Sequence, residues 1–213
     1  MASKIIICLV LGYAFGCFAT GYIVGKFKKI DIRKYGSYSA GTTNALRTLG
    51  PKAGAVTLIG DLLKAILAIL LVRYFIFPND PNVQLLALYT GLGVVIGHNY
   101  PFWLNFKGGK GIAATGGAMA AFDPFIIPVG LLVFIASIAI TKYVSVGSLL
   151  VSVLFPIWIA IRYPGDIHML IVAIIFTALA FIKHHTNIKR LLSGTENKLG
   201  QKVNINNIEN KCE

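Results

Sequence analysis

The stretch "IIICLVLGYAFGCFATGYIVG", residues 5–25, contains no charged residue and, as a helix, is long enough to cross the ~30 Å hydrocarbon core of a bilayer. Two further charge-free runs have a similar length, "PFIIPVGLLVFIASIAIT" at 124–141 and "YVSVGSLLVSVLFPIWIAI" at 143–161. Of the 213 residues, 56% are hydrophobic and 13% are charged, whereas a soluble domain is about a quarter charged. The sequence therefore predicts an all-α integral membrane protein that crosses the bilayer several times.

The first run predicts a membrane anchor rather than a cleaved signal peptide, because one Lys precedes it and no small-x-small cleavage pattern ends it. The cysteines do not predict a disulfide framework, since Cys8 and Cys17 lie inside this run and Cys212 lies near the end of the chain. The formal charge of +12 could indicate nucleic-acid binding. In a membrane protein it fits cytoplasmic loops that face anionic lipid, so we expect no nucleic-acid partner.

Seven membrane-spanning helices are expected in a single domain, residues 1–197, followed by a polar C-terminal tail, residues 198–213. The expected spans are 4–25, 53–77, 84–104, 111–123, 124–141, 143–161 and 166–182. The fourth span is the shortest, because its apolar part, 112–122, gives only about 16 Å of helix at ~1.5 Å per residue. Neighbouring residues must extend it if it is to cross the bilayer.

Two patterns inside these spans predict packing contacts. Asp61 and Lys64 are three residues apart, so they share a helix face and can form an ion pair. Gly12 and Gly16 have the small-xxx-small spacing that allows two membrane helices to approach closely.

The distribution of positive charge predicts the orientation. The segments 26–52, 105–111, Lys142 and the chain from 183 hold 16 of the 20 Lys and Arg residues. The turns on the other side, such as "PNDPN" and "YPGD", are short and acidic. The positive-inside rule then places the basic side in the cytoplasm and the N-terminus outside. This layout needs 111–123 to cross the membrane, because only then do Lys110 and Lys183 lie on the same side.

Three polar stretches lie on the predicted cytoplasmic side: "YGSYSAGTTNALRTLG" (35–50), "GHNYPFWLNFKGGKGIAATGG" (97–117) and "KHHTNIKRLLSGTENKLG" (183–200). A Gly/Ser/Thr-rich turn that opens a helix presents free N–H groups to an anion, and in the second stretch glycines allow the backbone to approach an oxyanion. Each stretch alone could be an ordinary interfacial loop, and none has the P-loop spacing. Together they predict a phosphate site at the membrane surface, with an apolar groove for a lipid chain.

In order and spacing, these stretches resemble the three signature motifs of the PlsY family, the bacterial acyl-phosphate glycerol-3-phosphate acyltransferases. The matching segments are "AGTTNALRTLG", "GHNYPFWLNFKGGKGIA" and "NIKRLLSGTENKLG", and "SVGS" at 145–148 resembles the family's serine-containing turn. The resemblance extends from the first span to about residue 200. Tyr38 and Ser39 stand where the family has Gly and Asn, and His185 stands where Arg is common.

The resemblance implies seven spans and transfer of an acyl chain from acyl phosphate to the 1-hydroxyl of sn-glycerol 3-phosphate. The products would be lysophosphatidic acid and inorganic phosphate, formed at the cytoplasmic face of a bacterial cell membrane. Its implied partners are these two substrates and membrane lipids, with no cofactor and no metal. The implied catalytic residues are Ser37, Arg47, Lys107, Lys110, His184 and Asn187. The implied substrate-binding residues are Gly41, Thr43, Asn44, His98, Asn99, Gly108, Gly109, Gly111, Ser145, Ser148 and Glu196.

The group that accepts the hydroxyl proton stays open among Glu196, neutral His184 and the leaving phosphate, which the resemblance favours. A transporter or channel for phosphate esters is the alternative function, but transport needs polar access from both faces. A scaffold for lipid-synthesis partners is a third reading, and it leaves the motif spacing unexplained.

Overall fold

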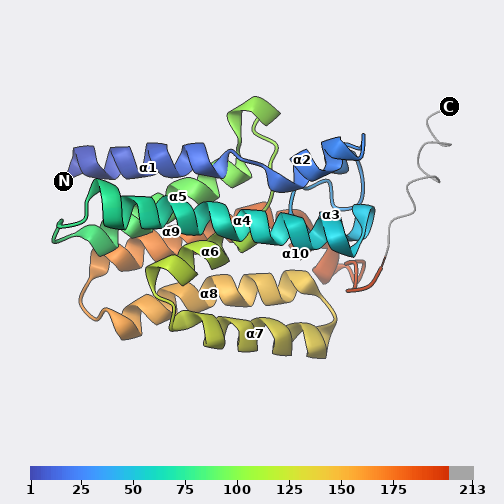
Figure 1. Cartoon of the computed structure of the whole chain (residues 1–213). Coiled ribbons are helices and arrows are strands. Elements are labelled where there is room, and N and C mark those ends of the chain that lie inside the picture. Colours follow the sequence, from blue (N-terminus) through green and yellow to red (C-terminus); the bar gives the residue numbers. More distant parts are fainter. Residues whose placement is uncertain (202–213) are drawn as a thin grey trace.

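The structure is a computed structural model that describes residues 1–201, which form helices and turns with no β-strand in that range. The all-α prediction is confirmed for this part of the chain, and residues 202–213 of the predicted tail lie outside it. Seven helices form a bundle along one axis (Figure 1). They are α1 (Ala2–Gly16), α4 (Pro51–Leu71), α5 (Val83–Asn99), α6 (Ile112–Phe122), α7 (Ile126–Thr141), α8 (Val144–Arg162) and α9 (Ile167–Lys183).

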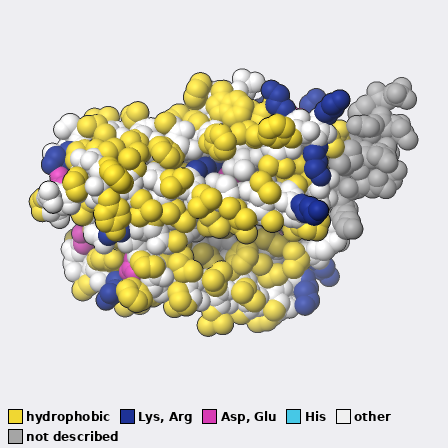
Figure 2. Space-filling model, in the orientation of Figure 1, with side chains coloured by type: hydrophobic (Ala, Val, Ile, Leu, Met, Phe, Trp, Pro, Cys, Tyr) yellow, Lys and Arg dark blue, Asp and Glu magenta, His cyan; other side chains and the backbone are white. Residues whose placement is uncertain are grey.

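Shorter helices connect these seven. The π-helical turn η2 (Val72–Ile76) continues α4, and η3 (Phe102–Leu104) follows α5. The helices α2 (Thr20–Phe27), α3 (Thr42–Leu49) and α10 (His185–Leu192) gather at the end of the bundle opposite the N-terminus (Figure 1). The 3₁₀ turn η1 (Ile32–Lys34) lies between α2 and α3 in the chain. We call this end of the bundle the basic end, because it carries most of the Lys and Arg side chains seen in Figure 2.

Three helical stretches of the described chain are long and apolar enough to cross a membrane: Ala2–Phe27, Pro51–Ile76 and Val144–Arg162. A fourth is present if α9 and α10, which are bent by 60°, count as one span. The apolar helices α6 and α7 are shorter than these. Hydrophobic side chains cover the long side of the bundle (Figure 2), as expected for a protein in lipid. Seven crossings and the orientation stay predictions.

The first predicted span is not one continuous helix, because the chain breaks between Gly16, where α1 ends, and Thr20, where α2 begins. A break inside lipid leaves backbone carbonyls that need donors. The side chain of Lys64 donates to the carbonyl oxygens of Gly16 and Phe18, at 3.3 and 2.9 Å. The indole N–H of Trp103 donates to the carbonyl oxygen between them, at 2.8 Å. Side chains from α4 and η3 therefore stabilise the break.

Close glycine packing holds α1 against α5. A Cβ added at Gly12 or Gly16 would lie 2.1 or 2.2 Å from a carbonyl oxygen of α5. In the reverse direction, a Cβ at Gly93 or Gly97 would lie 2.4 or 2.3 Å from a carbonyl oxygen of α1. The predicted close packing at Gly12 and Gly16 is confirmed, and the partner helix carries a matching pair of glycines.

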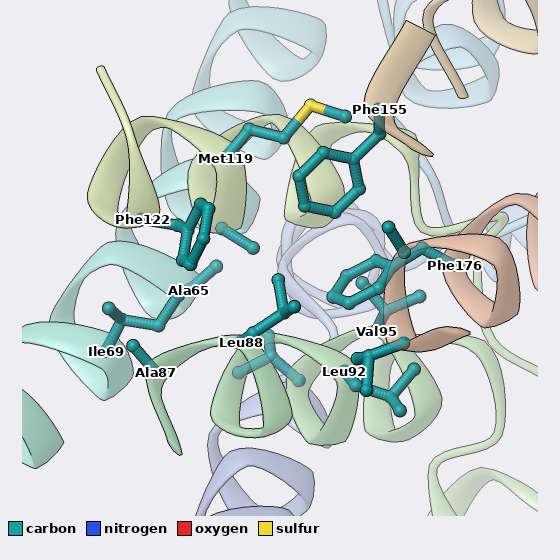
Figure 3. Packing of buried hydrophobic residues seen from close by; sticks show 14 of the residues in the cluster. Ala65, Ile69, Ala87, Leu88, Leu92, Val95, Met119, Phe122, Phe155 and Phe176 are labelled. Atoms are coloured by element: carbon teal, nitrogen blue, oxygen red, sulfur yellow. The ribbon is translucent and has the colours of Figure 1, made fainter. Parts of the chain in front are cut away.

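The core packs around the short helix α6 and joins it to α4, α5, α7, α8 and α9; Figure 3 shows part of this packing. Phe122 of α6 contacts Phe155 of α8 edge to face, with 6.4 Å between ring centroids, and Phe155 contacts Phe176 of α9 at 5.3 Å. Ile69 of α4 and Leu88 of α5 complete this side of the core. Lipid is as apolar as these side chains, so close packing rather than burial from water stabilises the contact. The packing fixes α6, and with it the loop that precedes α6.

The glycine packing predicts opposite effects for two substitutions. In Gly93→Ala the new methyl group would collide with the Leu9 carbonyl oxygen, so α1 and α5 must separate, at a cost of about 1–3 kcal/mol. A Cβ at Gly130 of α7 meets nothing within 4 Å, so Gly130→Ala should leave stability unchanged or slightly higher. Thermal unfolding of the purified protein in detergent measures both. Equal melting temperatures for the two variants would contradict this packing.

Candidate active site

The three polar stretches predicted from the sequence meet at the basic end of the bundle. The amide of Ala40 in the first stretch donates to the carbonyl oxygen of Gly108 in the second, at 3.4 Å. The Lys110 ammonium in the second stretch donates to Asn187 Oδ1 in the third, at 2.5 Å. The Arg47 guanidinium in the first donates to the carbonyl oxygen of Asn197 in the third, at 3.2 Å. Segments up to 150 residues apart in the chain therefore form one site.

Asn44 organises the first stretch. Its side-chain amide donates to the carbonyl oxygens of Ile32, Tyr35 and Ser39, at 2.7, 3.1 and 2.8 Å, and its Oδ1 accepts from the Ser37 amide at 2.9 Å. The residue is buried. Its polar atoms are occupied by the loop, so the structure supports a role in shaping the loop rather than the expected contact with substrate.

The helix expected after this loop is present as α3, and Gly41 caps it by accepting from the amides of Asn44 and Ala45. Thr43 lies in its first turn, where amide groups and the helix dipole favour an anion. Ser37 is held nearby through its own amide. These positions fit the expected anion site at the start of a helix.

Arg33, which the sequence did not single out, ties the first loop to the second. Its guanidinium forms an ion pair with Asp31 at 2.9 Å and donates to the carbonyl oxygens of Leu104 and Lys107, at 3.2 and 3.4 Å. The side chain also lies over the ring of Tyr22, 4.6 Å from its centroid. Arg33 therefore stabilises the joined loops.

The glycines of the second stretch face the end of α5 rather than an open site. The amides of Gly108 and Gly109 donate to the carbonyl oxygens of Asn99 and His98, at 3.2 and 3.0 Å. A Cβ at Gly109 would lie 2.0 Å from His98 Nε2, and one at Gly111 would lie 2.8 Å from Asn99 Oδ1. These glycines let the loop cap α5, so the amides of Gly108 and Gly109 are engaged within the protein, and their expected contact with substrate stays a prediction. His98 and Asn99 lie behind the loop and support it.

The carboxylate of Glu196, four residues after the end of α10, holds the third stretch to α8. Glu196 accepts from Ser145 Oγ at 3.2 Å, Asn187 Nδ2 at 2.7 Å and Arg190 Nε at 2.7 Å. Burial favours a higher pKa for Glu196, but these donors outweigh it, and the pKa lies below its usual value. Glu196 is therefore an anion that orients Asn187, and a weak candidate for a general base.

Arg190 was missed by the sequence interpretation. It follows Asn187 by three residues, so both side chains lie on the same face of α10 and reach the same carboxylate. This spacing was the signal available in the sequence. Arg190 adds a second guanidinium to the charge already provided by Arg47.

His184 presents an unprotonated ring nitrogen. Its Nδ1 lies 2.7 Å from the carbonyl oxygen of Ala180, which can only accept, so Nδ1 carries the proton and Nε2 is the acceptor. Burial, reinforced by the charge of Lys110, lowers the pKa of His184 to about 4. The imidazole is therefore neutral at physiological pH and can accept a hydrogen bond from a hydroxyl group.

The two lysines of the second stretch lie in different environments. Burial lowers the pKa of Lys110 to about 8 against the opposing effect of Glu196, and nearby cations add to the lowering. The Lys107 side chain is exposed and lines a surface hollow of about 550 Å³. This hollow also contacts Arg33, Lys34, Tyr38 and Lys183. Lys110 is thus part of the cluster with Asn187, whereas Lys107 lies at the surface beside it.

Ser148 is buried, and its hydroxyl donates to the carbonyl oxygen of Val144 in its own helix, at 2.9 Å. It lies one turn after Ser145, the serine that bonds Glu196. Among residues 1–201, no group of three or more His, Cys, Asp or Glu side chains is placed to hold a metal ion.

Residues 6–194 match a family model described as glycerol-3-phosphate acyltransferase. The chain belongs to this family. It is 41% identical over 201 residues to the glycerol-3-phosphate acyltransferase of Thermoanaerobacter pseudethanolicus, covering 94% of this chain and 98% of that one. It is 45% identical over 199 residues to that of Clostridioides difficile, covering 92% and 96%. The resemblance found from the sequence motifs is confirmed.

Two solved structures share the fold of this acyltransferase family member. The crystal structure of PlsY, an integral membrane glycerol 3-phosphate acyltransferase, in its glycerol 3-phosphate form has a TM-score of 0.82 and 31% identity. The lysophosphatidic acid form has a TM-score of 0.80 and 30% identity. Each covers 92% of this chain and 96% of the PlsY chain.

Proposed function

We propose that this chain transfers an acyl group from acyl phosphate to the 1-hydroxyl of sn-glycerol 3-phosphate, giving lysophosphatidic acid and inorganic phosphate. The observation that carries the proposal is the cluster of Arg47, Lys110 and Arg190 around Asn187 and neutral His184, at one end of an apolar bundle. The PlsY structures with glycerol 3-phosphate and lysophosphatidic acid support it, because one is a substrate and the other a product of this reaction.

The protein crosses a bacterial cell membrane seven times in this proposal. The α1–α2 pair forms the first span, and α4 to α9 form the other six. The basic end faces the cytoplasm, and the turns at Asp80 and Asp166 face outside. The supporting observation is the positive charge of the basic end, which the positive-inside rule assigns to the cytoplasm.

Three cations bind the phosphoryl groups of the two substrates. Arg47 and Arg190 can each grip a phosphate through two N–H donors, and Lys110 acts as a point charge. Glu196 is an acidic side chain that interacts electrostatically with both Arg47 and Lys110. One carboxylate offsets only one of the three positive charges, so the cluster keeps a net positive charge. This charge reduces the repulsion between acyl phosphate and glycerol 3-phosphate and stabilises the oxyanion that develops during transfer.

Acyl transfer here needs no acyl-enzyme, because the mixed anhydride of acyl phosphate is already activated. The substrate hydroxyl oxygen attacks the carbonyl carbon, the ester bond forms, and the bond to the phosphate oxygen breaks. His184 accepts a hydrogen bond from that hydroxyl through Nε2 and orients it. Its low pKa makes His184 a poor final proton acceptor, so the proton passes to the leaving phosphate.

The acyl chain lies against the apolar side of the bundle. Figure 2 shows this face hollowed between α4 above and the α7–α8 pair below, with hydrophobic side chains around the hollow. Serine residues at the start of α8 link this side to the site, since Ser145 bonds Glu196. A chain in this hollow would place its activated carbonyl group near the cation cluster.

A donor comparison tests the reaction directly. Purified protein in detergent, given glycerol 3-phosphate, should release inorganic phosphate and form lysophosphatidic acid with acyl phosphate. Acyl-CoA and acyl carrier protein should give no product, because neither brings a phosphoryl leaving group to the cations. Movement of glycerol 3-phosphate into sealed liposomes without product formation would instead support the transporter.

Lys110→Ala and Lys107→Ala form a matched pair within one loop. Loss of Lys110 removes a partly buried charge beside Asn187 and should lower kcat/KM for glycerol 3-phosphate by about 10²–10³-fold. Loss of exposed Lys107 should lower it less than about 10-fold, with an effect that fades at high salt. Steady-state kinetics with acyl phosphate measures both, and equal losses would contradict the distinct environments.

Because of Lys110, we expect activity to fall at high pH, which would appear as an alkaline limb of the pH profile. Lys110 has a folded-state pKa of about 8, so its charge is present below that pH and is lost as the pH rises through it. The value of kcat/KM reports the free enzyme and should fall above pH about 8. In Lys110→Arg the charge persists, so the limb should disappear. An unchanged limb in that variant would assign it to another group.

A further inference from the structure

A buried polar cluster lies deep in the bundle, beneath the candidate active site. Asp61 and Lys64 of α4 and His98 of α5 are 0%, 5% and 3% exposed. Asp61 Oδ1 accepts from Lys64 at 2.8 Å, which confirms the predicted ion pair, and from Thr20 Oγ1 at 3.2 Å. Placing charged groups inside a membrane costs free energy, so a buried cluster of charged residues indicates a functional role in addition to packing.

The Lys64 ammonium joins four segments of the chain. Besides Asp61, it lies within hydrogen-bond distance of the Gly16 and Phe18 carbonyl oxygens at the α1–α2 break and of His98 Nδ1, at 2.8 Å. It therefore connects α1, the α1–α2 break, α4 and α5 at one point. The contact with His98 of α5 connects this cluster to the candidate active site.

The contact with Lys64 selects one tautomer of His98. Two groups face His98 Nδ1: the Lys64 ammonium, which only donates, at 2.8 Å, and Asp61 Oδ1, which only accepts, at 3.5 Å. The shorter contact is with the donor, so Nδ1 accepts and the ring proton lies on Nε2. The Nε2 edge of the ring lies against Gly109, where a Cβ would come within 2.0 Å of it. The carbonyl oxygen of His98 also accepts from the Gly109 amide at 3.0 Å. The position of His98 therefore sets the position of Gly109, and Lys110 is the next residue.

We propose that Lys64 is a positioning residue for acyl transfer: it fixes His98 against Gly109, so that Lys110 reaches Asn187 and the phosphoryl site. The connection runs from Lys64 through His98 and the loop backbone to Lys110, with no contact between Lys64 and substrate. The inference rests on the proposed function for its kinetic consequence, but not for its effect on His98.

The experiment separates positioning from stability with a double variant. Lys64→Met alone leaves Asp61 as a buried unpaired charge and should unfold or weaken the protein. In Asp61→Leu/Lys64→Met both charges are gone, which removes the cost of a buried unpaired charge, although the carbonyl oxygens of Gly16 and Phe18 lose a donor. This variant should fold yet lose about 100-fold in kcat/KM for glycerol 3-phosphate, because a small displacement of the loop misplaces Lys110. If it does not fold, Asp61→Asn/Lys64→Gln, which removes both charges and keeps hydrogen-bonding groups at both positions, takes its place.

The matched control removes a different ion pair, between α1 and the turn that precedes α5. Lys4 pairs with Asp80 at the opposite end of the bundle from the site, and Asp80 is the more buried partner. Lys4→Met/Asp80→Leu should change the melting temperature without changing kcat/KM. Wild-type kcat/KM in a folded Asp61→Leu/Lys64→Met protein would overturn the proposal.

The tautomer of His98 supplies a readout that does not depend on turnover. In ¹⁵N-histidine-labelled protein, His98 should show an acceptor Nδ1 and a protonated Nε2, and the double variant should lose this signature while the control keeps it. A signature unchanged in the double variant would overturn the role of Lys64 even in an inactive preparation. Absence of turnover in the wild type would overturn the proposed function instead, leaving this test of Lys64 in place.

Discussion

The Glu196 carboxylate accepts hydrogen bonds from a serine of α8 and from the amide and guanidinium of α10. It thereby draws the C-terminal segment of the described chain onto the bundle and orients Asn187, whose oxygen receives Lys110. One anion offsets only part of the charge of Arg47, Lys110 and Arg190, so the assembled site remains positive. A surplus of cations, held in place by one carboxylate, is what a reaction between two phosphorylated substrates needs.

Inside the apolar bundle, few donors are available for backbone carbonyl groups that lie outside regular helix. The break between α1 and α2 is stabilised by Lys64 and Trp103, and the end of α5 is capped by the amides of Gly108 and Gly109. These local solutions also position the loop that carries Lys110. The same hydrogen bonds that satisfy irregular backbone within the apolar bundle therefore place the Lys110 side chain beside Asn187.

Much of this architecture could be predicted from local patterns. Apolar runs located the helices of the bundle but not the break between α1 and α2. Three-residue spacing predicted the Asp61–Lys64 pair, and four-residue spacing predicted the glycine packing of α1. The motifs also indicated that distant segments meet. Each of these signals depends on residues close together in the chain or on order along it.

The remaining features depend on tertiary contacts that no local pattern encodes. The glycines of the second stretch are compatible either with a bound oxyanion or with close packing against a neighbouring helix. Only the fold shows that His98 and Asn99 fill the space beside these glycines. From the sequence alone, Asn44 is a candidate to bind substrate. In the structure its side-chain amide instead donates to carbonyl oxygens of the surrounding loop. Lys107 and Lys110 look equivalent in the sequence, yet one is exposed and the other lies beside Asn187.

The central claim is that three distant segments form one site on one side of a membrane. Single cysteines at the exposed positions 46, 107 and 185, in a chain whose Cys8, Cys17 and Cys212 are replaced by Ser, test it most directly. A membrane-impermeant maleimide should label all three in inside-out vesicles and none in sealed right-side-out vesicles, with the reverse for a cysteine at exposed Asn79. Labelling of 46, 107 and 185 from different sides would contradict the claim.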